Sequence, residues 1–202
     1  MPEKQARLLS AALDLFVEKG FHGTTIPEIA RRAGVATGTV YLYFDGKERL
    51  VNEVLARVKG GLAGRLAREV PRGADIRAQF EAIWEVFTSF ALANERALAF
   101  CDLHNHAPYV APETLAVWEP ARTLLDDHFR RGAAAGVYRP LPPALLRALV
   151  AGALFGVHKF SRAGELAFSR EVLDQAREGA WAAVAAPPVT ASAPTSVGRS
   201  PT

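Results

Sequence analysis

The side chains with the clearest chemical potential in this 202-residue chain lie in a short uncharged stretch near the amino terminus. Thr37, Gly38, Thr39, Tyr41 and Tyr43 occur there close together. A threonine hydroxyl or methyl can meet a base edge in a DNA major groove, a glycine permits close backbone approach, and a tyrosine hydroxyl can donate to a phosphate. A stretch this short and aromatic is unusual for a solvated surface helix, so it favours recognition of DNA.

Positive charge accompanies this stretch. Lys47 follows it at the beginning of another expected helix, where its ammonium and the free helix amides together can hold a phosphate. Residues 1–68 hold 11 Lys and Arg against 7 Asp and Glu, whereas the remainder holds 13 against 14. The alternative is that the aromatic residues are core side chains. That alternative fits Phe44, but neighbouring Tyr41, Leu42 and Tyr43 cannot all face one core, so we expect at least one hydroxyl to point outward.

The elements that position these side chains are expected to be helices. Apolar residues recur at three- and four-residue spacing and β-branched alternation is scarce, which predicts an all-α fold. Gly20 should end the first helix, Thr25 and Glu28 have capping-box spacing at the start of the second, and Gly34 allows a sharp turn to the third. Asp45 and Glu48 repeat the capping spacing. The helices expected in this part span residues 2–19, 26–33, 37–44 and from after 45 towards 66. The second and third have helix-turn-helix spacing.

The stretch from Gly20 to Leu50, GFHGTTIPEIARRAGVATGTVYLYFDGKERL, closely resembles the DNA-binding signature of the tetracycline-repressor (TetR) family of bacterial regulators. The resemblance implies that double-stranded operator DNA is a partner. It implies phosphate contacts at Thr25 and Tyr43, recognition-helix positions at Thr37, Gly38, Thr39 and Tyr41, and a backbone clamp at Lys47. Ala36 departs from the pattern, since many members have Ser there as a helix cap, and this leaves the first residue of the third helix open by one.

A change of composition divides the chain. Glycines and one proline crowd the stretch 60–73, which predicts a flexible or bent junction with its boundary near Arg72. We expect a helix-turn-helix domain over residues 1–50 with a linking helix to about 72, a helical second domain over 73–186, and a disordered tail over 187–202. Pro120 should kink one helix. The helices expected in the second domain span residues 75–103, 112–135, 143–163 and 169–185.

Aromatic residues recur along two helices of the second domain. They could wall an apolar cavity, and plain core packing is the alternative. The TetR resemblance implies that this domain binds a small-molecule effector, which we expect to be apolar or amphipathic, with no cofactor. Arg96 and His104 lie near a segment junction, where they could orient a polar head or simply be solvated. The candidate ligand-binding residues are Trp84, Phe87, Arg96, Phe100, His104 and Trp118.

Small residues mark a candidate dimer contact on the helix expected at residues 143–163. Ala148, Gly152 and Gly156 would let another helix approach closely, with Phe155 as an anchor. The alternative is packing inside the monomer. One helix-turn-helix reads only a half-site, and the family resemblance implies dimerisation through the last two long helices, so we expect a homodimer on a palindromic operator.

Several other classes of protein are disfavoured. The chain has no G-x-S-x-G elbow, P-loop or dinucleotide fingerprint, so we expect no enzyme. Cys101, His104, His106 and His128 suit a transition metal, but no second cluster completes a ligand set, so no metal is expected. A single cysteine fits a reducing cytosol. The apolar run Ala148–Val157 is too short to cross a bilayer, and no signal peptide is apparent, so we expect a soluble cytoplasmic protein.

The sequence therefore predicts a sequence-specific DNA-binding transcriptional regulator, a repressor released from its operator by a small apolar or amphipathic molecule. Two alternatives stay open. In one, the second domain only dimerises or binds another protein. In the other, the chain is a small helical enzyme.

Overall fold

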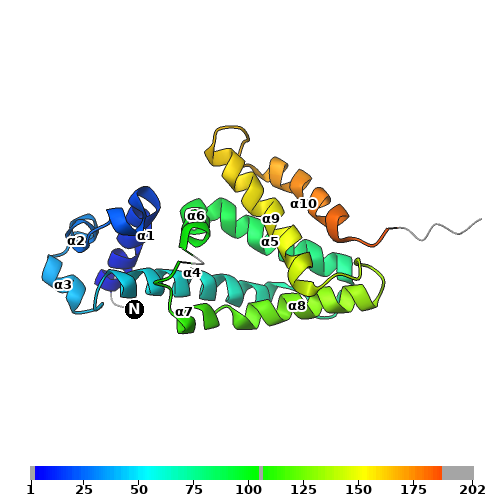
Figure 1. Cartoon of the computed structure of the whole chain (residues 1–202), viewed down its shortest axis with the longest axis horizontal. Coiled ribbons are helices and arrows are strands. Elements are labelled where there is room, and N and C mark those ends of the chain that lie inside the picture. Colours follow the sequence, from blue (N-terminus) through cyan, green and yellow to red (C-terminus); the bar gives the residue numbers. More distant parts are fainter. Residues whose placement is uncertain (1–2, 105–106, 188–202) are drawn as a thin grey trace, which may run out of the picture.

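The computed structural model describes residues 3–104 and 107–187, and all its regular elements within them are helices (Figure 1). One isolated bridge pairs Tyr138 with Ala185. The expected all-α class is confirmed, whereas the expected tail lies almost entirely outside the described residues. The helices are α1 Glu3–Gly23, α2 Ile26–Ala33, α3 Thr37–Tyr41, α4 Lys47–Glu69, α5 Ile76–Ala93, α6 Glu95–His104, α7 Pro112–Ala116, α8 Glu119–Ala134, α9 Pro143–Arg162 and α10 Arg170–Val184.

Three local signals near the amino terminus act as the sequence predicts. Gly20 interrupts α1 with a φ of 69°, and Gly34 ends α2 with a φ of 67° and a ψ of 41°, both in the left-handed region. The capping box of α2 forms, because the backbone N–H of Thr25 donates to Glu28 Oε2 over 3.0 Å. These features fix the angle between α1, α2 and α3.

Two predicted helix ends in this part are wrong. Helix α3 ends at Tyr41 and not at Phe44, because the chain turns so that Phe44 can enter the core, where it is 2% exposed. The second capping box does not form. Gly46 occupies the N-cap of α4 with a φ of 157°, so Asp45 lies one residue too early to cap the helix.

Helix α4 forms the long axis that joins the two halves of the molecule (Figure 1). It runs without a break through Gly60, Gly61 and Gly64, so the junction predicted over residues 60–73 is not bent at these three glycines. A Cβ at Gly60 would lie 3.4 Å from Val117 Cγ1, which shows that a small residue there lets the chain before α8 approach closely. The non-helical turn follows at residues 70–75.

The second half contains more helices than the sequence predicts. The expected helix over 75–103 is divided at Asn94 into α5 and α6, and the one over 112–135 is divided into α7 and α8. Pro120 does not kink a helix. It is the second residue of α8, where the missing N–H has no helical acceptor to lose. Helices α9 and α10 begin and end within one residue of their predicted bounds.

Helices α9 and α10 lie side by side as the outermost pair of the second half (Figure 1). Helix α9 is long and apolar enough to cross a membrane by length and composition alone, which the shorter apolar run in the sequence does not suggest. Only 22% of its most apolar window is buried within the described residues. A large apolar surface on α9 therefore faces away from the rest of the chain.

Candidate DNA-binding surface and effector cavity

Helix α3 is short, so packing against its neighbours must hold it in place. Val40 is fully buried and belongs to the same core cluster as Ile29 and Ala30 of α2, which are 0% and 1% exposed. Val35 in the turn packs partly against the same cluster. Five residues form too few turns for a stable isolated helix, so this small core fixes the orientation of α3.

The remaining residues of α3 form an exposed face. Thr37 and Gly38 are exposed, Thr39 is half-buried, and Tyr41 is 57% exposed. Nothing lies within 4 Å of a Cβ built on Gly38. Leu42, just after the helix, is 81% exposed, and the sequence analysis missed it. The sequence signal for this candidate DNA contact is an apolar residue between two tyrosines, since a leucine side chain can contact a thymine methyl.

The phosphate-contact candidates lie around this face and also support it. The Thr25 hydroxyl bonds with Glu28 Oε2 over 2.9 Å, and Tyr43 is half-buried against the core of the amino-terminal part. Lys47 Nζ donates to the Thr24 carbonyl over 2.9 Å and lies 4.4 Å from the centre of the Phe21 ring. The ammonium of Lys47, the first residue of α4, is thus held against the junction between α1 and α2.

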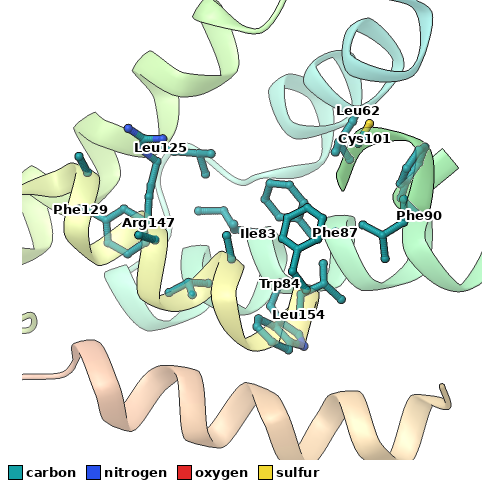
Figure 2. Close-up of a pocket in the computed structure, with 16 residues that line it drawn as sticks. Leu62, Ile83, Trp84, Phe87, Phe90, Cys101, Leu125, Phe129, Arg147 and Leu154 are labelled. Carbon is teal, nitrogen blue, oxygen red and sulfur yellow. The ribbon is translucent and has the colours of Figure 1, made fainter. Parts of the chain in front are cut away.

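A second candidate site is a cavity of about 230 Å³ inside the carboxy-terminal part (Figure 2). Its walls are almost entirely apolar, and they come from α4, α5, α6, α8 and α9. Figure 2 shows the rings of Trp84 and Phe87 on one side of the cavity and Arg147 at the other end. The lining residues are Leu62, Ile83, Trp84, Phe87, Phe90, Leu98, Cys101, Leu125, Phe129, Ala144, Arg147, Ala148, Val150, Ala151, Leu154 and Phe155.

Two of the six ligand-binding candidates, Trp84 and Phe87, line this cavity, and the other four do not. Trp118 lies beyond Phe87, with the two ring centres 6.3 Å apart. Phe100 is fully buried against Phe16 of α1, with ring centres 6.1 Å apart.

The two polar candidates also lie outside the cavity. Arg96 Nη1 forms ion pairs with Asp14 and Glu18 of α1, over 2.7 and 3.2 Å. His104 is 2% exposed, and its Nδ1 lies 2.7 Å from the Tyr109 hydroxyl. Arg96 and His104 lie outside the cavity because the helix breaks at Asn94, so that α6 is rotated independently of α5. Both side chains are thereby directed towards the amino-terminal part.

Polar groups in the cavity are few, and the sequence analysis did not assign them to it. Arg147 Nε donates to Asp126 Oδ1 over 2.6 Å, so its charge is already compensated. Burial raises the pKa of the Cys101 thiol to about 11, so it is uncharged near neutral pH. The described residues contain no group of three or more potential metal ligands, and His106 is not among them.

The four dimer candidates lie on neighbouring parts of the α9 surface, and two of them border the cavity. Ala148 and Phe155 line the cavity. Gly152 is exposed and Gly156 half-buried, and nothing lies within 4 Å of a Cβ built on either of them. With them, an outward stripe at helical spacing is formed by Leu145, Leu149, Gly152, Gly156 and Phe160, whose three large side chains are 44%, 37% and 49% exposed.

The fold and the exposed α3 define a helix-turn-helix protein with a larger helical second part. A family model for bacterial regulatory proteins of the tetR family matches residues 8–54, and one for the tetracyclin repressor-like C-terminal domain matches residues 57–186. The chain belongs to the TetR family of bacterial regulatory proteins.

Individual relatives agree with this assignment. The chain is 39% identical over 87 residues to the HTH-type transcriptional repressor KstR2 of Rhodococcus jostii, which covers 43% of this chain and 42% of that protein. It is 28% identical over 139 residues to the HTH-type transcriptional activator FasR of Mycolicibacterium smegmatis, covering 68% and 64%. A solved TetR-family structure from Shewanella sp. PV-4 superposes with a TM-score of 0.74 at 29% identity, covering 91% of this chain and 99% of that one. The matches thus span less than two thirds of both curated relatives.

Proposed function

We propose that this protein is a transcriptional repressor that binds a palindromic operator as a homodimer and is released by a small apolar effector. The observation that carries the proposal is the exposed, uncharged face of α3, held out by the buried α2–α3 core. Membership of the TetR family and the named repressor KstR2 among its relatives support it. We assign the protein to the cytoplasm and propose no enzymatic activity and no cofactor.

The exposed face of α3 supports direct base readout. Thr37 and Tyr41 present hydroxyls and Leu42 presents an apolar surface, which together can discriminate base edges in a major groove. Thr25 and Lys47 lie at the amino ends of α2 and α4, where free amides and positive charge favour phosphates. We assign base contacts to the first group and backbone contacts to the second.

The outward stripe of α9 supports the homodimer. It is energetically unfavourable to leave three large apolar side chains exposed to water, as Leu145, Leu149 and Phe160 are here. The two glycines in the stripe leave room for a crossing helix. Two symmetric copies can then present their α3 helices to half-sites about 34 Å apart. A second copy also explains how a helix this apolar can be accommodated in a protein that binds DNA.

The cavity supports an effector that is mainly apolar and small. An engineered cavity of about 150 Å³ lined by aliphatic and aromatic side chains binds benzene. A cavity of about 230 Å³ is therefore suited to a compound somewhat larger than benzene, with any polar group at the Arg147 end. One relative is named a fatty acid metabolism regulator and one solved structure a ketosteroid transcriptional regulator, which supports a hydrophobic effector class.

The operator proposal is tested by selecting random duplexes with the purified protein. Enrichment of an inverted repeat supports it, and recovery of no enriched sequence contradicts it. The same repeat placed in a reporter promoter distinguishes repression from the activation that the relative FasR is named for. Loss of reporter output on adding the protein supports repression, and a gain contradicts it.

The effector proposal is tested with a cavity-filling variant. We expect Ala148→Phe, on the cavity wall, to abolish binding of naphthalene and decanoic acid followed by tryptophan fluorescence, while operator binding persists. Ala134→Phe, at an exposed position near the end of α8, is the matched control and should bind both compounds as the parent protein does. A parent protein that binds these compounds with no change in operator affinity would favour a second domain that only dimerises.

A further inference from the structure

We propose that the protein has a second ligand site, for an organic phosphate, in a basic pocket on the far side of α8. This pocket has a volume of about 590 Å³ and lies between α8 and the turn that follows α4. Leu125 and Phe129 of α8 face the effector cavity, whereas Leu124 and His128 face this pocket, so the two sites are separated by the helix itself. The residues that carry the proposal are Arg72, Gln79, Thr123, His128, Arg130 and Arg131.

The charge of the pocket is positive and largely uncompensated. Three arginines and one aspartate line it. Arg130 pairs with Asp127, but no carboxylate of the described residues lies within 4 Å of the guanidinium of Arg72 or Arg131. Most other arginines of this half do have such a partner, namely Arg65, Arg77, Arg96, Arg122, Arg147, Arg170 and Arg177. Two cations without a carboxylate partner therefore face the same pocket.

A buried amide connects the backbone of Arg72 with the side chain of Arg131. Gln79 is 2% exposed, and its Nε2 donates to the carbonyls of Arg72 and Ala74 over 3.3 and 3.0 Å, which anchors the turn. Its Oε1 therefore faces the other way, where it accepts from Arg131 Nη2 over 2.9 Å. One side chain thus fixes the backbone of Arg72 and the guanidinium of Arg131 relative to each other.

His128 holds the side-chain amide of Gln79 in this orientation. It is 1% exposed, and burial lowers its pKa to about 4, so the ring is neutral near pH 7. Because Gln79 Oε1 is an acceptor, His128 Nδ1 donates to it over 3.1 Å, and Nε2 accepts from the Tyr138 hydroxyl over 2.6 Å. The polar side-chain atoms of Gln79, His128 and Tyr138 all have partners, so Arg131 Nη2 is held by a fixed acceptor before any ligand binds.

This arrangement fits a doubly charged phosphate group. Guanidinium groups bind phosphate oxygens through paired N–H donors, and two cations on different walls match a dianion. Thr123 adds a hydroxyl, and the volume exceeds what a single phosphate fills, which leaves room for an attached organic group. Helix α4 has 23 residues and is about 34 Å long, so operator phosphates beside Lys47 lie far from this site at the other end (Figure 1).

The test uses the full chain without operator DNA, so its outcome is independent of the proposed function. Phenyl phosphate is titrated by calorimetry at low ionic strength into the parent protein and into Arg131→Gln and Arg72→Gln. We expect saturable binding of one molecule per chain, weakened by about tenfold to a hundredfold in each variant. Arg162→Gln removes the same charge from an exposed position outside the pocket and should bind as the parent does.

Further variants distinguish binding in this pocket from general attraction between phenyl phosphate and positive charge on the protein. Arg131→Lys keeps the charge but not the paired donors, and it should restore only part of the affinity. Thr123→Val, which keeps every charge, should weaken binding by severalfold and covers the case in which an arginine variant fails to fold. Absence of saturable binding to the parent, equal loss in Arg162→Gln, or succinate binding as tightly as phenyl phosphate would each overturn the proposal.

Discussion

Lowering the pH from 6.5 towards 4 should destabilise the fold through His128. The ring is buried beside Gln79 and Tyr138, and burial followed by the charge of Arg131 lowers its pKa from 6.5 to about 4. In the unfolded chain the imidazole has its ordinary pKa, so the unfolded state takes up a proton first as the pH falls. The contribution of His128 is therefore complete above about pH 6.5 and is lost between pH 6.5 and 4.

The size of this destabilisation follows from the change in the pKa of His128 on folding. Each pKa unit corresponds to about 1.4 kcal/mol, so a change from 6.5 to about 4 amounts to roughly 3 kcal/mol of unfolding free energy. That is a large fraction of the ~5–15 kcal/mol typical of a domain. Burial also lowers the pKa of His104 and His158, so these two rings act in the same direction. Glu28, whose pKa hydrogen bonds from Lys19 and Thr25 lower to about 2, acts in a lower window, between about pH 4.5 and 2.

The assay compares urea unfolding of the parent protein and His128→Gln at one protein concentration, followed by tryptophan fluorescence at pH 7.5, 6.5, 5.5 and 4.5. Glutamine does not titrate, so the variant should lose less stability than the parent over this range, with the difference approaching ~3 kcal/mol at the lowest pH. His22→Gln, at an exposed position, is the matched control for a histidine substitution. Parallel pH curves for the parent and His128→Gln would refute the reasoning.

Three further predictions follow from single positions. Lys47→Ala should reduce the slope of log affinity for the operator against log salt concentration by about 0.9. Because Lys47 Nζ bonds to the Thr24 carbonyl, the variant should also lose ~1 kcal/mol of unfolding free energy. An unchanged salt slope contradicts a phosphate contact at Lys47. Gly132→Ala should cost ~1–3 kcal/mol in urea unfolding, since its Cβ would overlap the ring of Tyr138, and an unchanged midpoint contradicts this packing. Cys101 should react with iodoacetamide at pH 8 roughly a hundredfold more slowly than an ordinary thiol, and a bound effector should slow it further.

The parts of the fold that sequence reasoning predicts well depend on local chemistry. Gly20 and Gly34 adopt left-handed conformations that few other residues accept, and Thr25 with Glu28 closes a capping box within four residues. These signals do not depend on the rest of the molecule. The same spacing at Asp45 and Glu48 misleads, because Gly46 already supplies the backbone conformation that the start of α4 requires.

The effector cavity could be predicted only in part. Trp84 and Phe87 lie on a long helix whose apolar face is evident from spacing, and both line the cavity. The polar end of the cavity was missed, since Arg147 reaches it from α9, more than forty residues further along the chain. The small residues on α9 were interpreted as one dimer surface, and spacing alone did not indicate that Ala148, one turn before Gly152, also borders the cavity.

Helix α6 links the cavity to the DNA-binding half in a way that no local pattern reveals. Leu98 and Cys101 line the cavity, while Phe100 packs on Phe16 of α1 and His104 is buried in the same region, 5.8 Å from the Phe16 ring centre. Close-packed side chains cannot shift on one face of a helix alone. We therefore expect an effector that displaces Leu98 and Cys101 to repack Phe100 against α1. Helix α1 packs against α2, and α2 packs against α3. If the proposed effector releases the operator through α6, a helix of ten residues, each ligand is expected to weaken the binding of the other by the same factor.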